Sequence, residues 1–137
     1  MSDNCIFCKI INNELPSYTI YEDDYFKAIL DLFPGSLGHT VLIPKQHAAD
    51  IFELPDEIAA KGLVVAKKIA AAIKIALGCG GINVLQNNGV DAGQSVQHFH
   101  IHLIPRREND DFKIPWKTLK LTEEEFQNIR NMICGAL

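Results

Sequence analysis

The sequence lacks an apolar run long enough to cross a bilayer, and it lacks a cluster of basic residues. Its 13 Lys and Arg against 17 Asp and Glu give a formal net charge of −4. This balance provides no general attraction to phosphate backbones, so we expect neither nucleic acid nor a membrane as partner. The start Met1-Ser2-Asp3-Asn4 also lacks the basic and apolar segments of a signal peptide, and we predict a cytoplasmic location.

Cysteine is scarce as well. The four cysteines do not form a dense disulfide framework, and only Cys5 and Cys8 lie close together in the sequence. In a reducing compartment such residues are thiols, metal ligands or catalysts. With 47% apolar residues, 137 positions and no internal repeat or linker, the chain is predicted to form a single domain over 1–137.

The hydrophobic pattern predicts an α+β domain in which helices pack on an antiparallel sheet. A capping box at Thr122 and Glu125 predicts a last short helix. The other expected elements are a short helix at 6–11, a long helix at 55–77, and strands at 18–21, 25–30, 39–43, 82–86 and 96–104.

The long helix carries more apolar residues than one face needs. Leu63, Val64 and Ala70 widen its apolar stripe. The excess predicts either a surface that contacts a second copy of the chain or a deeply buried helix, and the pattern alone favours neither.

Three histidines alternate in His98-Phe99-His100-Ile101-His102. In a strand this spacing places the imidazoles on one face over about 13 Å, while the apolar residues between them point into the core. One such histidine is usually just exposed, but three together indicate a site. Residues i and i+4 of a strand are too far apart to share one zinc ion easily, so nucleophilic or acid–base chemistry at phosphorus fits the three better.

The loop Asn87 to Ser95 precedes these histidines. It offers backbone N–H groups, the side chains of Asn87 and Gln94, the flexible Gly93 and the Ser95 hydroxyl, which together suit phosphate oxygens. Hairpin loops rich in Asn and Gly are common, so the loop by itself is weak evidence.

The segment Gly93-Gln94-Ser95-Val96-Gln97 followed by His98 to Ile104 resembles the histidine triad (HIT) superfamily. Further landmarks lie at 5–11, at Asp31-Leu32 and at 39–47. The Gly-Gln-Ser-Val form is similar to the branch of purine nucleoside phosphoramidases. The resemblance implies a HIT-like fold with a five-stranded antiparallel sheet per subunit, one long helix and short flanking helices, and a homodimer that shares a ten-stranded sheet.

The resemblance also implies roles for the histidines. His100 attacks the α-phosphorus of a nucleotide and forms a nucleotidyl-histidine, which water then hydrolyses. Its other ring N–H needs an acceptor, which the family provides through the backbone carbonyl of His98. His102 and His39, with Gln94 and Ser95, hold the phosphate and help to move protons.

A nucleotide pocket follows from the same resemblance. Asp31 matches the acid that binds the ribose hydroxyls, although without the resemblance it is an ordinary turn residue. The apolar residues that match the walls around a purine base, and that equally suit a core, are Phe7, Ile10, Ile29 and Leu32.

The Cys5–Cys8 pair has two interpretations. A redox motif follows a strand, and no strand precedes this pair, so zinc is the stronger candidate. Two more ligands are then needed, and similar sites in bacterial family members imply His47 and His98. Structural zinc is therefore the expected cofactor, with no organic cofactor, and it removes His98 from the reaction.

We predict a HIT-family hydrolase that acts on purine nucleoside phosphoramidates or similar nucleotide conjugates. One alternative is a dinucleoside polyphosphate hydrolase, and another is a nucleotide-binding regulatory module with incidental turnover. Arg106 and Arg107, which follow the triad, suit solvated surface charge or contact with an extended phosphate chain.

Overall fold

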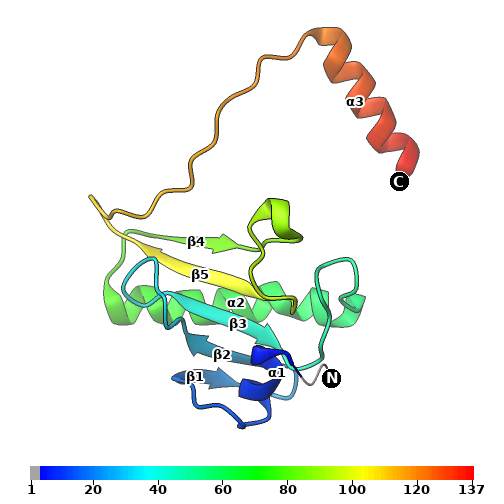
Figure 1. Ribbon diagram of the computed structural model, residues 1–137. Coiled ribbons are helices and arrows are strands. Elements are labelled where there is room, and N and C mark those ends of the chain that lie inside the picture. The colour runs from blue at the N-terminus through cyan, green and yellow to red at the C-terminus, as the bar shows by residue number, and fades with distance from the viewer. Residues whose placement is uncertain (1–3) are drawn as a thin grey trace.

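Five antiparallel strands form one sheet in the order β1-β2-β3-β5-β4 (Figure 1). The structure is a computed structural model that describes residues 4–137. Residues 1–3, on which the expectation about a signal peptide partly rests, lie outside that range. The strands are β1 (Thr19–Glu22), β2 (Phe26–Leu30), β3 (Thr40–Pro44), β4 (Gly81–Leu85) and β5 (Ile101–Arg106).

The helices of the described residues are α1 (Ile6–Ile11), α2 (Asp56–Leu77) and α3 (Glu123–Ala136), and a 3₁₀ turn lies at Val90–Ala92. Pro55 precedes α2, and Asp56 and Glu57 occupy its first turn, where negative charge suits the helix dipole. Gly78 ends α2 in the left-handed conformation (φ 60°). The α+β architecture predicted from the sequence is confirmed.

The sheet separates two apolar clusters. The larger cluster fills the space between the sheet and α2, and includes Phe26, Leu42 and Leu103. Gly62 of α2 faces Ile101 and Phe26 in this cluster, and a Cβ there would lie at ordinary contact distance from Ile101 (3.7 Å). The smaller cluster lies under α1 and consists of Ile10, Ile29, Val41 and Ile43. The functional side chains border this second cluster.

The fifth strand begins later than expected. The sequence predicts a strand from Val96, but β5 starts at Ile101, so His98 and His100 precede the strand and only His102 lies in it. The physical reason is a different set of backbone hydrogen bonds, because the N–H of Phe99 donates to the carbonyl of Ala48 (2.7 Å) instead of to a neighbouring strand. The alternation survives: Phe99, Ile101 and Leu103 are buried in the larger cluster.

Helix α2 leaves part of its apolar surface uncovered. Leu63 and Val64 are 66% and 69% exposed. The alternative of a deeply buried helix is therefore wrong for the isolated chain. Among the described residues, no helix is both long and apolar enough to span a membrane.

Helix α3 stands away from the rest of the chain at the end of an extended segment (Figure 1). Its predicted capping box is present: the N–H of Glu125 donates to Thr122 Oγ1 (3.2 Å), and the N–H of Thr122 donates to Glu125 Oε2 (2.7 Å). The helix has 14 residues, and none of them is buried.

Candidate active site and metal site

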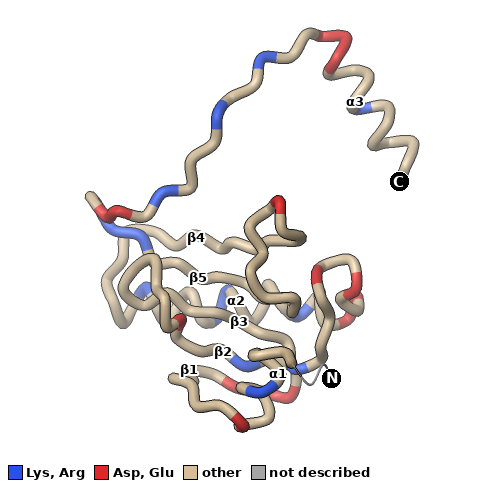
Figure 2. Tube along the Cα trace, viewed as in Figure 1, with Lys and Arg blue, Asp and Glu red and all other residues tan. Residues whose placement is uncertain are grey.

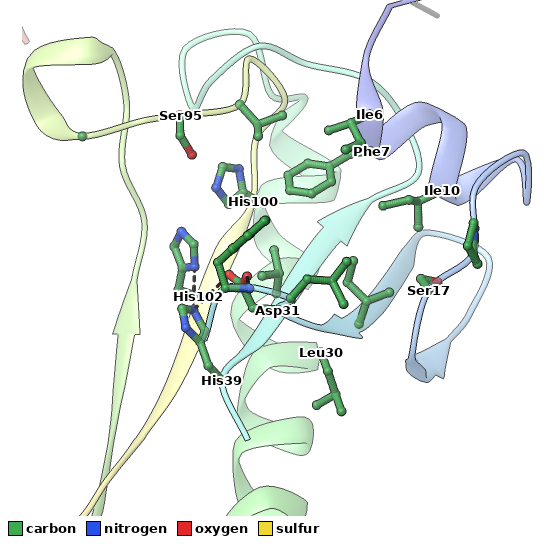
Figure 3. A pocket seen from close by; sticks show the side chains of 17 residues that line it. Ile6, Phe7, Ile10, Ser17, Leu30, Asp31, His39, Ser95, His100 and His102 are labelled. Carbon is green, nitrogen blue, oxygen red and sulfur yellow. Dashed lines mark hydrogen bonds and ion pairs between the residues drawn. The ribbon is translucent and has the colours of Figure 1, made fainter. Parts of the chain in front are cut away.

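A cavity of about 440 Å³ opens beside α1, and most of the predicted nucleotide-site residues line it (Figure 3). Asn87, Gln94 and His98 do not line it. The predicted residues that do are Phe7, Ile10, Ile29, Asp31, Leu32, His39, Gly93, Ser95, His100 and His102.

His100 presents one ring nitrogen to the cavity. Its Nδ1 lies 2.7 Å from the carbonyl oxygen of His98. Because a carbonyl can only accept, Nδ1 carries the proton and Nε2 has a free lone pair. Burial lowers the pKa of His100, against the opposing effect of the His98 carbonyl, so the ring is neutral near pH 7. Phe7 packs edge-on to the ring at 5.1 Å between centroids.

His102 and His39 form a hydrogen-bonded pair whose tautomers are set by Gly35. The backbone N–H of Gly35 donates to His39 Nδ1 (3.0 Å), so the proton of neutral His39 resides on Nε2. That Nε2–H donates to His102 Nδ1 (2.9 Å). The remaining proton of neutral His102 is then on its Nε2. Each ring is thus a hydrogen-bond donor with a fixed direction.

Both rings of this pair favour the neutral form. Burial lowers the pKa of His102 to about 4, and the neighbouring His100 and His39 add to the effect. Burial also lowers the pKa of His39, although the Asp31 carboxylate opposes this. Asp31 Oδ2 lies 3.6 Å from His39 Nε2. The pair therefore acts through neutral N–H donors near pH 7.

Asp31 follows β2 at the mouth of the cavity. Its Oδ1 accepts the N–H of Phe33 (2.8 Å), which fixes the carboxylate at the start of the turn. The turn leaves Leu32 and Phe33 67% and 92% exposed while both border the cavity. A carboxylate among exposed apolar side chains suits the hydroxyls of a sugar next to a flat base.

In the loop before the histidines, the polar side chain of Gln94 binds backbone groups and that of Ser95 faces the cavity. Gln94 is buried, and its amide is fully engaged: Nε2 donates to the carbonyls of Ala49 (2.6 Å) and Val96 (3.0 Å), and Oε1 accepts the N–H of Gly89 (2.8 Å). The Gln94 side chain thus holds the loop in shape. Ser95 is exposed, lines the cavity and lies next to His100 (Figure 3).

The second cluster lies on the other side of Phe7. It contains Cys5, Cys8, His47 and His98, whose ligand atoms all lie within 4.8 Å of one another. Both imidazoles turn Nδ1 inward, and these two nitrogens are 3.1 Å apart. The outer Nε2 of His98 lies 2.9 Å from the carbonyl oxygen of Pro44, to which it donates. Burial lowers the pKa of His98 to about 4, which leaves Nδ1 free of a proton.

The donor set and its dimensions fit a tetrahedral metal ion. The Cys5 and Cys8 sulfurs lie 3.4 and 3.6 Å from His98 Nδ1, and Cys8 Sγ lies 3.4 Å from His47 Nδ1. Around tetrahedral zinc, nitrogen and sulfur ligands are about 3.6 Å apart, and two nitrogens about 3.3 Å. A cation between the two imidazoles would accept a lone pair from each inward-facing Nδ1. The cluster is therefore a possible metal site, and the Pro44 carbonyl orients one of its ligands.

Sequence reasoning missed the backbone groups that orient the histidines. The N–H of Gly35 and the carbonyl of Pro44 set the tautomers of His39 and His98. Neither group leaves a signal in side-chain identity.

Arg106 is occupied by structural contacts. Its guanidinium donates to both Asp110 oxygens and to Asn83 Oδ1 (2.7 Å), and it lowers the pKa of Asp110. Contact with an extended phosphate chain gains no support from this arrangement.

Comparisons with known proteins agree with this site. The chain is 47% identical to a HIT family protein from Bacillus anthracis whose crystal structure covers 100% of this chain and 99% of its own, with a TM-score of 0.92. It is 46% identical over 104 residues to an adenosine 5'-monophosphoramidase from Saccharomyces cerevisiae, covering 76% of this chain and 63% of that protein. A zinc-bound histidine triad protein from Mycobacterium smegmatis is 35% identical, with a TM-score of 0.79 and coverage of 99% and 97%.

The fold, the histidine-lined cavity and the similarity to an adenosine 5'-monophosphoramidase first define a class, that of the nucleotide hydrolases. The family is shown by the HIT domain model, which matches residues 12–109. The chain belongs to the HIT family, as predicted. Its Cys5–Cys8 segment precedes the matched region.

Proposed function

We propose that the protein hydrolyses purine nucleoside phosphoramidates or similar nucleotide conjugates at the α-phosphate, through a covalent nucleotidyl-His100. The observation that carries this proposal is the orientation of His100. The His98 carbonyl holds its Nδ1–H, so the unprotonated Nε2 faces a cavity lined by a carboxylate and apolar side chains. An unprotonated imidazole is a competent nucleophile near pH 7.

In the first step Nε2 of His100 forms a bond to the α-phosphorus, and the bond from phosphorus to the leaving amine breaks. The amine takes a proton from solvent, which reaches the open cavity beside Ser95. Water then attacks the phosphorus, loses one proton to solvent and breaks the bond from phosphorus to Nε2, which releases the nucleoside monophosphate and restores the neutral His100. The Nε2–H of His102 donates to a phosphoryl oxygen in both steps, where such fixed donors stabilise the developing charge.

The remaining cavity residues suit the nucleoside. Asp31 accepts hydrogen bonds from the ribose hydroxyls, and Phe7, Ile10, Ile29 and Leu32 contact the base. Gly93 lines the cavity with a φ of 84°, which a residue with a side chain rarely adopts, and its N–H donates to the carbonyl of Val90 (2.9 Å), so it shapes the loop beside the cavity. His39 acts through His102 as a positioning residue.

Zinc is the metal that we propose for Cys5, Cys8, His47 and His98. Four ligands and no open position make this a structural site, in which the ion links the N-terminal segment to the residues before β5. The thiolates need reducing conditions, which fits the predicted cytoplasmic location. We further propose a homodimer in which the exposed Leu63 and Val64 of α2 and the free edge of β4 meet a second copy and extend the sheet to ten strands.

A substrate panel tests the proposed activity. Adenosine 5'-phosphoramidate, an adenylated lysine and a diadenosine polyphosphate are each incubated with the wild type and with His100→Ala. We expect the wild type to cleave the first two faster than the third, and rapid acid quenching followed by mass spectrometry to find adenylate on the peptide that contains His100. Equal near-zero rates for both proteins on all three substrates would refute the proposal.

A further inference from the structure

Besides the exposed apolar side chains of α2, residues 4–137 leave two further apolar surfaces uncovered. The first is a stripe along α3, formed by Phe126, Ile129 and Ile133, which are 56%, 45% and 58% exposed. These positions lie on one face of the helix because they are spaced by three and four residues. An isolated helix of 14 residues is at the margin of stability in water, so α3 needs a surface to cover its stripe.

The second surface is a groove of about 310 Å³ between α2 and the β1 side of the sheet. We call it the α2–β1 groove. Its rim includes Ile20, Leu30 and Leu77, which are 46%, 37% and 39% exposed. The lining residues are Ile20, Tyr21, Leu30, Gly38, Thr40, Lys68, Ile69, Ala72, Ile73, Ala76 and Leu77.

The charges around the two surfaces are complementary. Helix α3 begins with Glu123, Glu124 and Glu125 (Figure 2). The groove has Lys68 in its wall, and the exposed Lys74 lies on the adjacent turn of α2. An acidic helix end next to these lysines favours docking in one direction.

The residues just before the C-terminal arm (residues 113–137) are held in place by several contacts. Arg106 binds Asp110 and also donates to the carbonyl of Phe112. The Phe112 ring packs on Gly35, where an added Cβ would lie only 2.6 Å from it. From Phe112 the arm leads past the β4 edge of the sheet, whereas the α2–β1 groove lies on the β1 side (Figure 1). The arm is therefore directed away from the groove of its own chain.

The overall similarity to a relative of known crystal structure extends to the C-terminal arm. The arm makes up about a fifth of the chain, so a TM-score of 0.92 over the whole length requires a similar arm position in the Bacillus anthracis protein. Since the apolar stripe of α3 is not covered by its own chain, a position shared with a crystallised relative indicates that a surface of another molecule covers it.

We infer that the C-terminal arms are exchanged between two copies of the chain, with the apolar stripe of each α3 docked in the α2–β1 groove of the other. The exchange is reciprocal, as a two-fold symmetric pair requires. It rests on the proposed homodimer and adds a second contact, distant from the proposed contact through α2 and β4. It does not depend on the proposed hydrolase activity.

Cross-linking of the full-length, zinc-loaded protein tests the exchange. Ala72→Cys places a thiol in the groove, and the native Cys134 is an exposed thiol on α3, whereas Cys5, Cys8 and Cys79 are buried. A short bis-maleimide is expected to give a covalent dimer on a denaturing gel, with a 72–134 peptide link found by mass spectrometry. The wild type and Ala72→Cys with Cys134→Ser are the controls, and neither forms this link.

A matched pair of substitutions on α3 tests the docking face. Ile129→Gln lies in the stripe, and Asn131→Gln lies on the opposite side of the helix. Burial of one isoleucine stabilises by enough to change an equilibrium about tenfold, so the yield of the 72–134 link falls about tenfold in the first variant and is unchanged in the second.

The outcomes separate this inference from the proposed dimer. A 72–134 link within one chain, or no link after both thiols have reacted, overturns arm exchange. If light scattering then still shows a dimer, the contact through α2 and β4 stands without exchange. If it shows a monomer, both are wrong, while the substrate panel continues to judge the activity separately.

Discussion

The two histidine clusters on either side of Phe7 use the same side chain for different purposes. In the metal cluster, His47 and His98 turn Nδ1 toward each other and toward two sulfurs. In the cavity, His100, His102 and His39 are oriented by a carbonyl, an imidazole and a backbone N–H. The comparison teaches that the partner of one ring nitrogen decides what the other nitrogen can do.

The two clusters lie close together, and they are coupled. Phe7 packs edge-on to both His98 (5.9 Å) and His100 (5.1 Å). The carbonyl that orients His100 belongs to His98, whose ring faces the sulfurs. A metal ion bound to the His98 ring would therefore fix the residue whose backbone carbonyl orients the proposed nucleophile, His100. Four predictions test how far the two clusters can be separated.

The largest effect is expected from His100→Ala. Loss of the proposed nucleophile is expected to lower kcat by at least about 10⁴-fold, because the covalent intermediate then cannot form on the Nε2 that faces the cavity. We expect the variant to keep the proposed zinc ion, since the His100 ring is not among the four candidate ligands. Steady-state rates and metal analysis of the same preparation measure both effects. Loss of the zinc together with the activity would show that the clusters are one unit.

Next in size is the effect of Cys8→Ser on stability. Without one thiolate the metal affinity drops, and a ligand present at about a thousand times its Kd contributes about 4 kcal/mol to folding. We expect thermal unfolding at a lower temperature and substoichiometric zinc by emission spectroscopy. Cys134→Ser is the matched control, because Cys134 is exposed on α3 and far from the cluster. Equal melting temperatures for the two variants would contradict a structural metal.

The sequence predicts the body of the fold well where the pattern is periodic. Eight positions recur along α2 at steps of three and four, and six of them are buried, namely Ile58, Gly62, Val65, Ala66, Ile69 and Ile73. The other two, Ala72 and Ala76, are exposed. The capping box of α3 was also predictable, because it needs only Thr122 and Glu125 at the right spacing. The cavity residues, in contrast, came mostly from the family resemblance.

The rest depends on contacts that sequence patterns do not encode. Residues 96–100 alternate as a strand does, but the carbonyl of Ala48 takes the N–H of Phe99 and displaces the start of β5. The amide of Gln94 has a phosphate-binding chemistry, yet three backbone groups of the fold occupy it. In both cases a backbone partner distant in sequence decides the outcome.

A smaller effect is expected from His39→Ala. This ring does not need to touch the reacting atoms, because it orients His102 through a 2.9 Å hydrogen bond. Loss of such a positioning group lowers kcat by about 10- to 100-fold. KM changes little, and His39→Gln restores part of the rate since its amide can donate to His102 Nδ1. A large rise of KM with constant kcat would instead assign His39 to substrate binding.

The smallest effect concerns pH and separates the clusters by titration. The folded pKa of His102 is about 4, below the ordinary value of 6.5, so the unfolded chain binds the proton more readily. Its contribution to stability is fully present above pH 6.5 and is lost as the pH falls toward 4. Between about pH 7.5 and about pH 5.5 the loss is about 1 kcal/mol for this residue. In zinc-saturated protein, denaturant unfolding should therefore depend less on pH for His102→Gln than for the wild type by about this amount. His98 is expected to be held by the metal under these conditions and to add nothing to the difference. Equal pH dependence of the two proteins would therefore mean that His102 is no more difficult to protonate than a free histidine.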